Sequence, residues 1–123
     1  MSKGTYLGIR AAGRRMIDQG SGRIINISSQ AGCSGWPLLG AYCAAKFAID
    51  GLTQVAAAEL GPHGITVNAI CPGTVETPLL EQIPLRRFQR PADVADAAVF
   101  LAADGGGYIT GEALLSTGGQ TMP

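Results

Sequence analysis

Three polar side chains in the first half of the chain have the types and spacing needed for acid–base chemistry: Ser29, Tyr42 and Lys46. Tyr42 and Lys46 are four positions apart, so in a helix they lie one turn apart on the same face. A free phenol ionises only near pH ~10, and a neighbouring ammonium favours the ionised form, so that proton exchange moves toward neutral pH. The spacing alone favours the alternative, a tyrosine and a lysine on the solvent face of an alanine-rich helix.

The segments around these residues predict how the three side chains are held. Ser29 follows an apolar run that predicts a β-strand over residues 23–28, and Tyr42 and Lys46 fall in an apolar run that predicts a helix over 41–60. Open α/β sheets place their ligands at the carboxyl ends of the strands. We therefore expect the hydroxyl, the phenol and the ammonium to converge there, with the Ser29 hydroxyl holding a substrate oxygen.

The rest of the chain alternates strands and helices in the same way. Further helices are predicted over residues 4–19 and 91–103, and further strands over 65–70 and 112–116. A helix between two strands gives the right-handed crossover of a parallel sheet. The strands at 23–28 and 65–70 are apolar throughout, which is typical of strands buried on both faces. The expected fold class is α/β, a partial doubly wound parallel sheet of about three strands with three to four helices.

Four ordered segments resemble the classical short-chain dehydrogenase/reductase family. They are IINISSQAG followed by YCAAK, then GITVNAICPGTVETPLL, RPADVADAAVFLAAD and YITGEALLSTGG. The resemblance spans residues 4–119 and implies a Rossmann-like fold and an NAD(P)-dependent oxidoreductase acting on a carbonyl or a secondary alcohol. It implies that Tyr42 gives or takes the proton, that Lys46 assists it and binds the nicotinamide ribose, and that Ser29 positions the substrate.

The same resemblance places further cofactor contacts in the loop after residues 65–70. Together with Tyr42 and Lys46, the implied cofactor-binding residues are Pro72, Gly73, Val75 and Thr77. An ordinary strand-to-helix loop is the alternative for this segment. The aromatic and aliphatic residues at positions 36–39 fit either the wall of a substrate pocket or plain loop packing.

The family pattern also predicts what this sequence lacks. The resembled family opens with a strand, a glycine-rich loop and a helix that hold the adenosine and pyrophosphate, and no segment here matches them. We therefore expect a single truncated catalytic-half domain over residues 1–123, without the N-terminal nucleotide-binding half, and weakened binding of NAD or NADP. The strand at 23–28 should then expose an open edge. The alternative functions are a non-catalytic oligomerising remnant and an inactive fragment.

Composition narrows the possible partners and the expected location of the protein. The chain has 9 basic and 9 acidic residues and no basic run, which argues against a nucleic-acid partner. No apolar run reaches the ~18 residues of a membrane span, and a cytoplasmic protein is expected. Cys33, Cys43 and Cys71 lack metal-ligand spacing, so reduced core thiols and no metal site are expected. The helices at 4–19 and 41–60 predict a homo-oligomer, because the second is apolar nearly all round.

Overall fold

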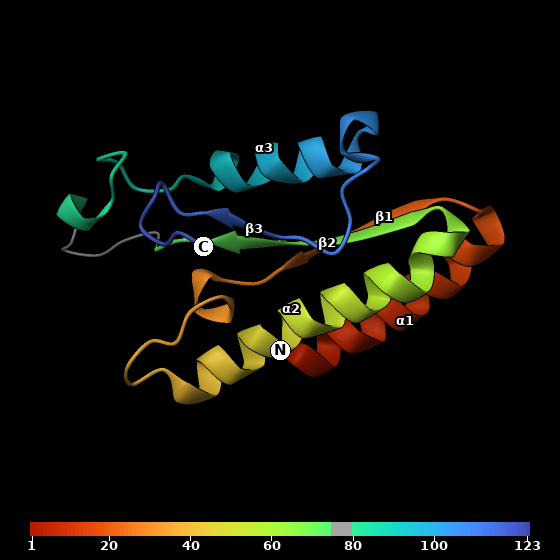
Figure 1. Ribbon diagram of the computed structural model, residues 1–123, viewed down its shortest axis with the longest axis horizontal. Coiled ribbons are helices and arrows are strands. Elements are labelled where there is room, and N and C mark those ends of the chain that lie inside the picture. The colour runs from red at the N-terminus through yellow and green to blue at the C-terminus, as the bar shows by residue number, and fades with distance from the viewer. Residues whose placement is uncertain (75–79) are drawn as a thin grey trace.

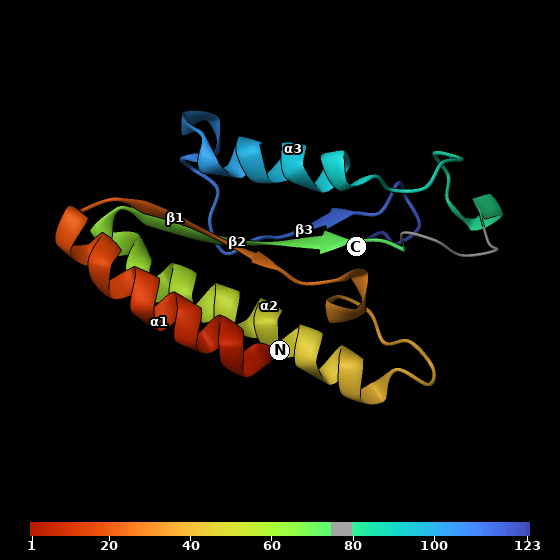
Figure 2. The ribbon, with the colours of Figure 1, turned by 180° about the vertical axis from the view of Figure 1, so that it is seen from behind.

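The computed structural model describes residues 1–74 and 80–123. Its helices and strands are, in chain order, α1 (Ser2–Gln19), β1 (Gly22–Ile27), α2 (Gly40–Leu60), β2 (Ile65–Pro72), α3 (Pro91–Ala102) and β3 (Ala113–Ser116). Figure 1 shows α1 and α2 side by side against one face of the sheet and α3 against the other, and the view from behind in Figure 2 agrees. None of the helices in the described ranges is long and apolar enough to cross a membrane.

The three strands form one parallel sheet in the order β1-β2-β3. Ile24 of β1 is opposite Val67 of β2, and Ile70 of β2 is opposite Leu114 of β3. Helix α2 connects β1 to β2, and α3 connects β2 to β3 across the opposite face. This arrangement confirms the predicted α/β class, with helices on both faces of a three-stranded parallel sheet.

The central and edge strands differ in burial. In β2 every residue from Ile65 to Cys71 is buried, as the apolar run predicts. In β1 only Ile24 is buried, and Ile27 is 51% exposed. The prediction that residues 23–28 are buried on both faces is therefore wrong. Among the described residues β1 pairs with β2 alone, so its other edge is open, as the sequence predicts.

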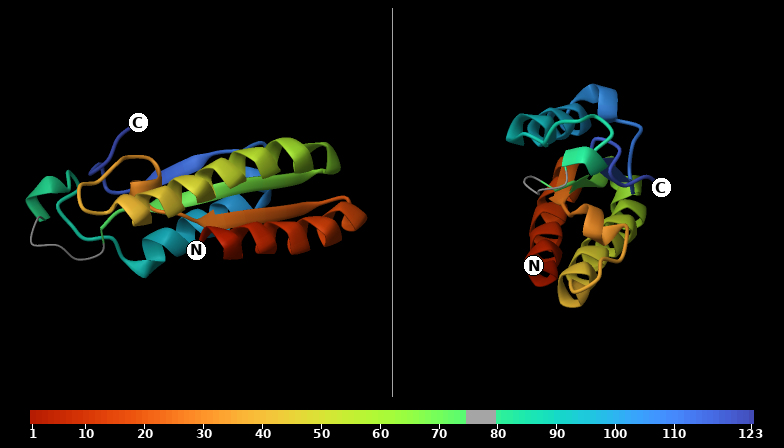
Figure 3. Two further views of the ribbon diagram at one scale, coloured as in Figure 1. Left: turned by 90° about the horizontal axis from the view of Figure 1, so that it is seen from below. Right: turned by 90° about the vertical axis from the view of Figure 1, so that its left-hand side faces the viewer.

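The core lies between the sheet and the pair α1 and α2. It is built from small and branched residues of β1, α2 and β2: Ile24, Ala56, Ala57, Ile65 and Val67. Partly buried residues of α1 and α2 pack against it: Ile9, Ala12, Met16 and Leu60. Helix α1 ends at Gly20, whose φ of 73° is left-handed and whose N–H donates to the Ile17 carbonyl. Seen from below, the long axes of α1 and α2 follow the strands (Figure 3).

The start of α3 is fixed by ionic hydrogen bonds. Pro91 occupies the first turn, and the Asp93 carboxylate accepts from the Arg90 backbone N–H at 2.7 Å. The Arg87 guanidinium donates to both carboxylate oxygens, at 2.7 and 3.0 Å. These contacts, those from Arg87 first, hold the pKa of Asp93 well below its ordinary range. Asp93 thus caps the helix as an anion at its positive end.

Asp93→Asn should lower the melting temperature at neutral pH, because the variant loses the charge that caps α3. The pKa of Asp93 is lower in the folded than in the unfolded chain, so its stabilisation is present above the unfolded value of about 4 and is lost as pH falls toward the folded value. Thermal unfolding followed by circular dichroism should therefore show a smaller gap to the wild type near pH ~3 than near pH ~7.

Asp96→Asn is the matched control on the same helix, since Asp96 is exposed and makes no ion pair with another described residue. It should melt close to the wild type at both pH values. A gap for Asp93→Asn that does not change with pH would contradict this account of the cap.

Candidate active site

Ser29 lies where β1 ends, at the start of a 3-10 turn over Gln30–Gly32. Its backbone is extended, and its Oγ accepts a hydrogen bond from the Ala31 N–H at 3.2 Å. A hydroxyl that accepts in this way keeps its own proton to donate. The turn therefore fixes the Ser29 side chain and leaves its O–H available for a ligand oxygen.

Tyr42 and Lys46 lie on the first turns of α2 and share a face, as their spacing predicts. Lys46 is only 8% exposed, and its Nζ donates to the carbonyl oxygens of Ile27 at 3.2 Å and Ser28 at 2.9 Å. The same Nζ lies 5.7 Å from the centre of the Tyr42 ring. Lys46 thus joins the phenol-bearing helix to the strand end that carries Ser29, and uses two of its three N–H donors in doing so.

A pocket of about 410 Å³ opens beside these groups. Its lining comes from the turn after β1, the segment before α2, the first turn of α2 and the loop after β2; the residues are Ser29, Gln30, Ala31, Trp36, Leu39, Tyr42, Gly73 and Thr74. Tyr42 is 38% exposed, so a ligand can reach it. Ser29, Tyr42 and the predicted cofactor residue Gly73 are therefore brought together at one pocket.

The other predicted cofactor residues have different positions. Pro72 is the last residue of β2, half-buried and not part of the pocket lining. Val75 and Thr77 lie outside the described residues. In the segment 36–39, Trp36 and Leu39 line the pocket, which favours the pocket-wall interpretation for these two, whereas Leu38 is fully exposed.

Gln30 is a pocket residue that the sequence reasoning missed. It is buried, its Nε2 donates to Thr74 Oγ1 at 3.0 Å, and its Oε1 accepts from Thr121 Oγ1 at 2.7 Å. Thr74 Oγ1 in turn donates to Gln120 Oε1 at 3.2 Å. Gln30 thereby ties the turn after β1 to the loop after β2 and to the C-terminal segment. The only indication in the sequence is a polar residue inside the run SSQAG, which does not reveal these distant partners.

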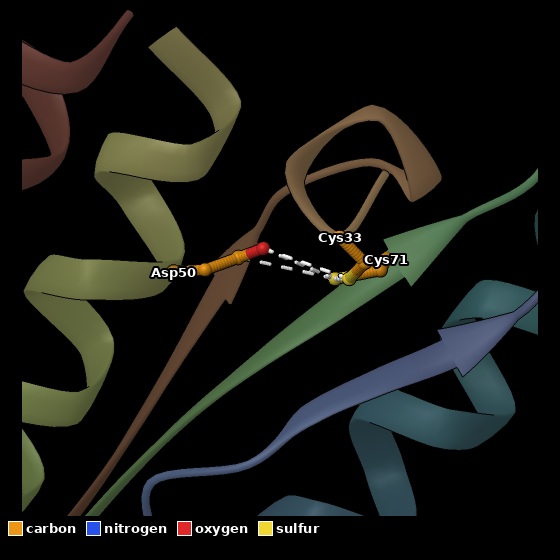
Figure 4. A group of neighbouring side chains, drawn as sticks. All are labelled: Cys33, Asp50 and Cys71. Carbon is orange, nitrogen blue, oxygen red and sulfur yellow. Dashed lines mark hydrogen bonds between the residues drawn. The ribbon is translucent and has the colours of Figure 1, made fainter. Parts of the chain in front are cut away.

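A cluster of three polar side chains, two of them buried, lies outside the pocket lining. The Sγ atoms of Cys33 and Cys71 are 3.5 Å apart, and Asp50 Oδ2 lies 3.7 Å from the first and 3.9 Å from the second (Figure 4). Burial, followed by the Asp50 charge, raises the pKa of Cys71 to about 12, and burial likewise raises the pKa of Cys33. All three cysteines are free, as the sequence predicts, and Cys43 is buried elsewhere on α2.

Comparison with known proteins gives the family. The family model described as enoyl-(acyl carrier protein) reductase matches residues 1–121. A short-chain dehydrogenase/reductase of Armillaria gallica is 44% identical over 137 residues, which cover 95% of this chain and 52% of the relative. This chain belongs to the short-chain dehydrogenase/reductase family.

Other family members agree in sequence and structure. The 2,5-dichloro-2,5-cyclohexadiene-1,4-diol dehydrogenase of Sphingobium indicum is 41% identical over 134 residues, covering 96% of this chain and 54% of the relative. The acetoin dehydrogenase of Salmonella typhimurium superposes with a TM-score of 0.89 at 40% identity, over 96% of this chain and 51% of that one. The chain therefore spans about half the length of the relatives it matches.

Gly32→Ala should lower the free energy of unfolding, because the added methyl group would crowd the residues that support the site. An added Cβ at this position would lie 2.5 Å from Asp50 Oδ2, 2.6 Å from Ser28 Oγ and 3.0 Å from the Lys46 carbonyl oxygen. Overpacking of this kind costs roughly 1–3 kcal/mol of the free energy of unfolding, to be measured by urea unfolding.

Gly35→Ala is the matched control for Gly32→Ala. Its Cβ would meet nothing within 4 Å, and its φ is not left-handed. It should change the free energy of unfolding by no more than about 0.5 kcal/mol or increase it slightly. Equal effects of the two substitutions would show that the close contacts around Gly32 do not matter.

Proposed function

We propose that this chain carries the catalytic centre of a short-chain dehydrogenase/reductase, which interconverts a carbonyl compound and a secondary alcohol with NAD or NADP. The observation that carries the proposal is the position of Lys46. Its ammonium lies 5.7 Å from the Tyr42 ring and bonds the carbonyls that lead into Ser29, while Ser29 and Tyr42 line one pocket. The family resemblance assigns catalytic roles to the same three residues.

The proposed roles follow from the donors and acceptors. The Ser29 O–H donates to the substrate oxygen, and the Tyr42 hydroxyl gives its proton to that oxygen in reduction or takes the alcohol proton in oxidation. The Lys46 ammonium, 5.7 Å from the centre of the Tyr42 ring and largely shielded from water, lies beside the group that exchanges the proton. A nicotinamide cofactor, when held beside these residues, would supply the hydride chemistry at the carbon that bears this oxygen.

The residues present fit the nicotinamide-ribose end of the cofactor. Lys46 keeps a third N–H beyond its two carbonyl bonds, its Nζ lies 5.7 Å from the centre of the Tyr42 ring, and Tyr42 and Gly73 both line the pocket. Pro72, Val75 and Thr77 complete the proposed contacts by resemblance. No segment of the sequence opens a helix with the glycine-rich loop that binds pyrophosphate, so we expect this chain by itself to bind NAD or NADP weakly.

The second candidate function is a non-catalytic oligomerising module. The observation in its favour is the amount of apolar surface left uncovered on the described residues: the open edge of β1, where Ile27 is 51% exposed, and the outer faces of α1 and α2. This candidate predicts a defined oligomer that neither binds NADH or NADPH saturably nor turns over a ketone.

Tyr42→Phe should lower turnover at least ~100-fold, because the variant keeps the ring and loses the proton that is exchanged. The measurement is oxidation of NADH and of NADPH with a small test ketone, after titrating each cofactor by its nicotinamide fluorescence. Tyr108→Phe is the control: Tyr108 is fully exposed, does not line the pocket, and should leave turnover unchanged. Turnover that survives in Tyr42→Phe, or saturable binding without any wild-type turnover, would refute the proposed catalytic role.

We further propose that α1 and α2 form a homo-oligomer interface. Six large apolar or aromatic side chains are exposed on these two helices: Tyr6, Leu7, Ile17, Tyr42, Phe47 and Val55. A groove of about 280 Å³ between the helices is lined in part by Tyr6, Leu52 and Val55. Contiguous apolar surface of this kind is typical of protein–protein interfaces.

Val55→Asp should therefore shift the protein to a smaller species on a sizing column, because it places a charge in the proposed interface. Val99→Asp on the outer side of α3 is the control, since Val99 is also exposed but lies on the opposite face of the sheet. Light scattering should give a lower molar mass for Val55→Asp and the wild-type mass for Val99→Asp. If both elute with the wild type, or both become smaller, α1 and α2 do not form the interface.

A further inference from the structure

We propose that Cys33, Asp50 and Cys71 form a binding site for one tetrahedral, thiolate-preferring divalent cation of the zinc type. The proposal does not depend on hydride transfer, because none of the three side chains lines the pocket beside Tyr42. The three residues come from separate elements: Cys33 follows the 3-10 turn after β1, Asp50 lies on α2 and Cys71 on β2. Figure 4 shows their polar atoms directed at one another.

The distances match the edges of a coordination tetrahedron. With zinc–sulfur bonds of about 2.3 Å and zinc–oxygen bonds of about 2.1 Å, tetrahedral angles require about 3.8 Å between sulfurs and about 3.6 Å between sulfur and oxygen. The observed values are 3.5 Å between the sulfurs, and 3.7 and 3.9 Å from Asp50 Oδ2 to Cys33 and Cys71. The implied ligand–metal–ligand angles lie within about 15° of tetrahedral. One oxygen and two sulfurs therefore fit one ion without moving the backbone.

The charge at the cluster also favours a cation. Asp50 is 8% exposed, and within the described residues the hydrogen bonds to its carboxylate come from the two thiols, which are weak donors. No Lys, Arg or His nitrogen in the described part of the chain lies within 4.0 Å of its oxygens. A buried carboxylate without a cation is costly. A divalent ion neutralises it, with each sulfur–metal bond forming as the S–H proton leaves to solvent.

Gly32 and Cys33 give this site room and access. A side chain at Gly32 would lie 2.5 Å from Asp50 Oδ2, so the glycine is what allows the carboxylate to sit there. Cys33 is partly exposed, whereas Cys71 is fully buried. An ion and one water as the fourth ligand can therefore reach the cluster from the Cys33 side. Two sulfur ligands favour a zinc-type ion over Mg²⁺ or Ca²⁺, which prefer oxygen ligands.

The expected role of the ion is structural. It would clamp the turn after β1, the helix α2 and the strand β2, which are the elements that hold Ser29, Lys46 and Gly73. Asp50 lies one turn along α2 from Lys46, and the Lys46 carbonyl oxygen already accepts from Ser28 Oγ at 3.3 Å. Structural zinc sites contribute directly to folding energy. A disulfide between the two sulfurs is the competing reading, and it requires them to close from 3.5 Å to about 2.05 Å.

The test uses the purified chain, reduced and treated with a chelator, and Co²⁺ as a spectroscopic substitute for Zn²⁺. Co²⁺ should give the intense visible bands of a tetrahedral complex and a thiolate-to-cobalt charge-transfer band, and added Zn²⁺ should abolish both. Cys33→Ser and Cys71→Ser should each lose the charge-transfer intensity of one sulfur, and Asp50→Asn should weaken binding at least ~10-fold. Cys43→Ser, which removes a buried thiol on the same helix outside the cluster, should bind as the wild type does.

A second measurement covers the case in which Cys71→Ser fails to fold. Zn²⁺ at a hundredfold excess over its dissociation constant should raise the melting temperature of the wild type and of Cys43→Ser by roughly 10 °C or more. It should raise that of Cys33→Ser and Asp50→Asn much less. The proposal is overturned if Co²⁺ gives no thiolate band, if the band survives in Cys33→Ser at full strength, or if the isolated chain carries a Cys33–Cys71 disulfide and the reduced form binds no metal.

Discussion

The arrangement of the candidate site depends on the ammonium of Lys46 at the end of β1. At the carboxyl edge of a parallel sheet the last carbonyls of an edge strand lack a partner on their open side, and Lys46 donates to two of them, from Ile27 and Ser28. The side chain is almost fully buried, so these bonds replace the water that the charge gives up. Because Tyr42 precedes Lys46 by one turn, anchoring the ammonium also sets where the phenol lies. The Lys46 hydrogen bonds that attach α2 to the end of β1 therefore also orient the Tyr42 side chain.

The same end of the molecule is where the sheet is least enclosed. Strand β2 is buried along nearly its whole length because it has a strand on each side and a helix layer on each face. Strand β1 has helix layers on both faces and one neighbouring strand, and its last residue, Ile27, is half-exposed next to the Lys46 bond. Ser29 thus lies between a buried central strand and an open edge. Its position is maintained by the bond to Ala31, by the Lys46 bond to the Ser28 carbonyl, and by the Ser28 N–H, which donates to the Ile70 carbonyl of β2 at 2.8 Å.

Local sequence patterns predicted most of this fold and part of the site. The alternation of strands and helices, the glycine that ends α1 and the proline that starts α3 all act through short-range physics, and the structure has them where expected. The predicted burial of β1 was wrong. An apolar run shows that a strand can be buried, but it does not show how many strands pair with it. Gln30 and the Cys33–Asp50–Cys71 cluster were missed for a related reason. Gln30 bonds Thr74 and Thr121, and distances between residues so far apart in the chain exist only once the sheet is assembled.

The candidate active site and the buried cluster share their backbone, and this constrains both. The segment from Ser28 to Cys33 presents Ser29 to the pocket and Cys33 to the cluster, and one turn of α2 separates Lys46 from Asp50. Gly32 lies between the two, within a Cβ's reach of Asp50 Oδ2, Ser28 Oγ and the Lys46 carbonyl. A close-packed interior transmits displacements instead of absorbing them. Any group that moves Asp50 or the two sulfurs must therefore also move the backbone that supports Ser29 and Lys46, so the packing behind the pocket helps to set the geometry within it.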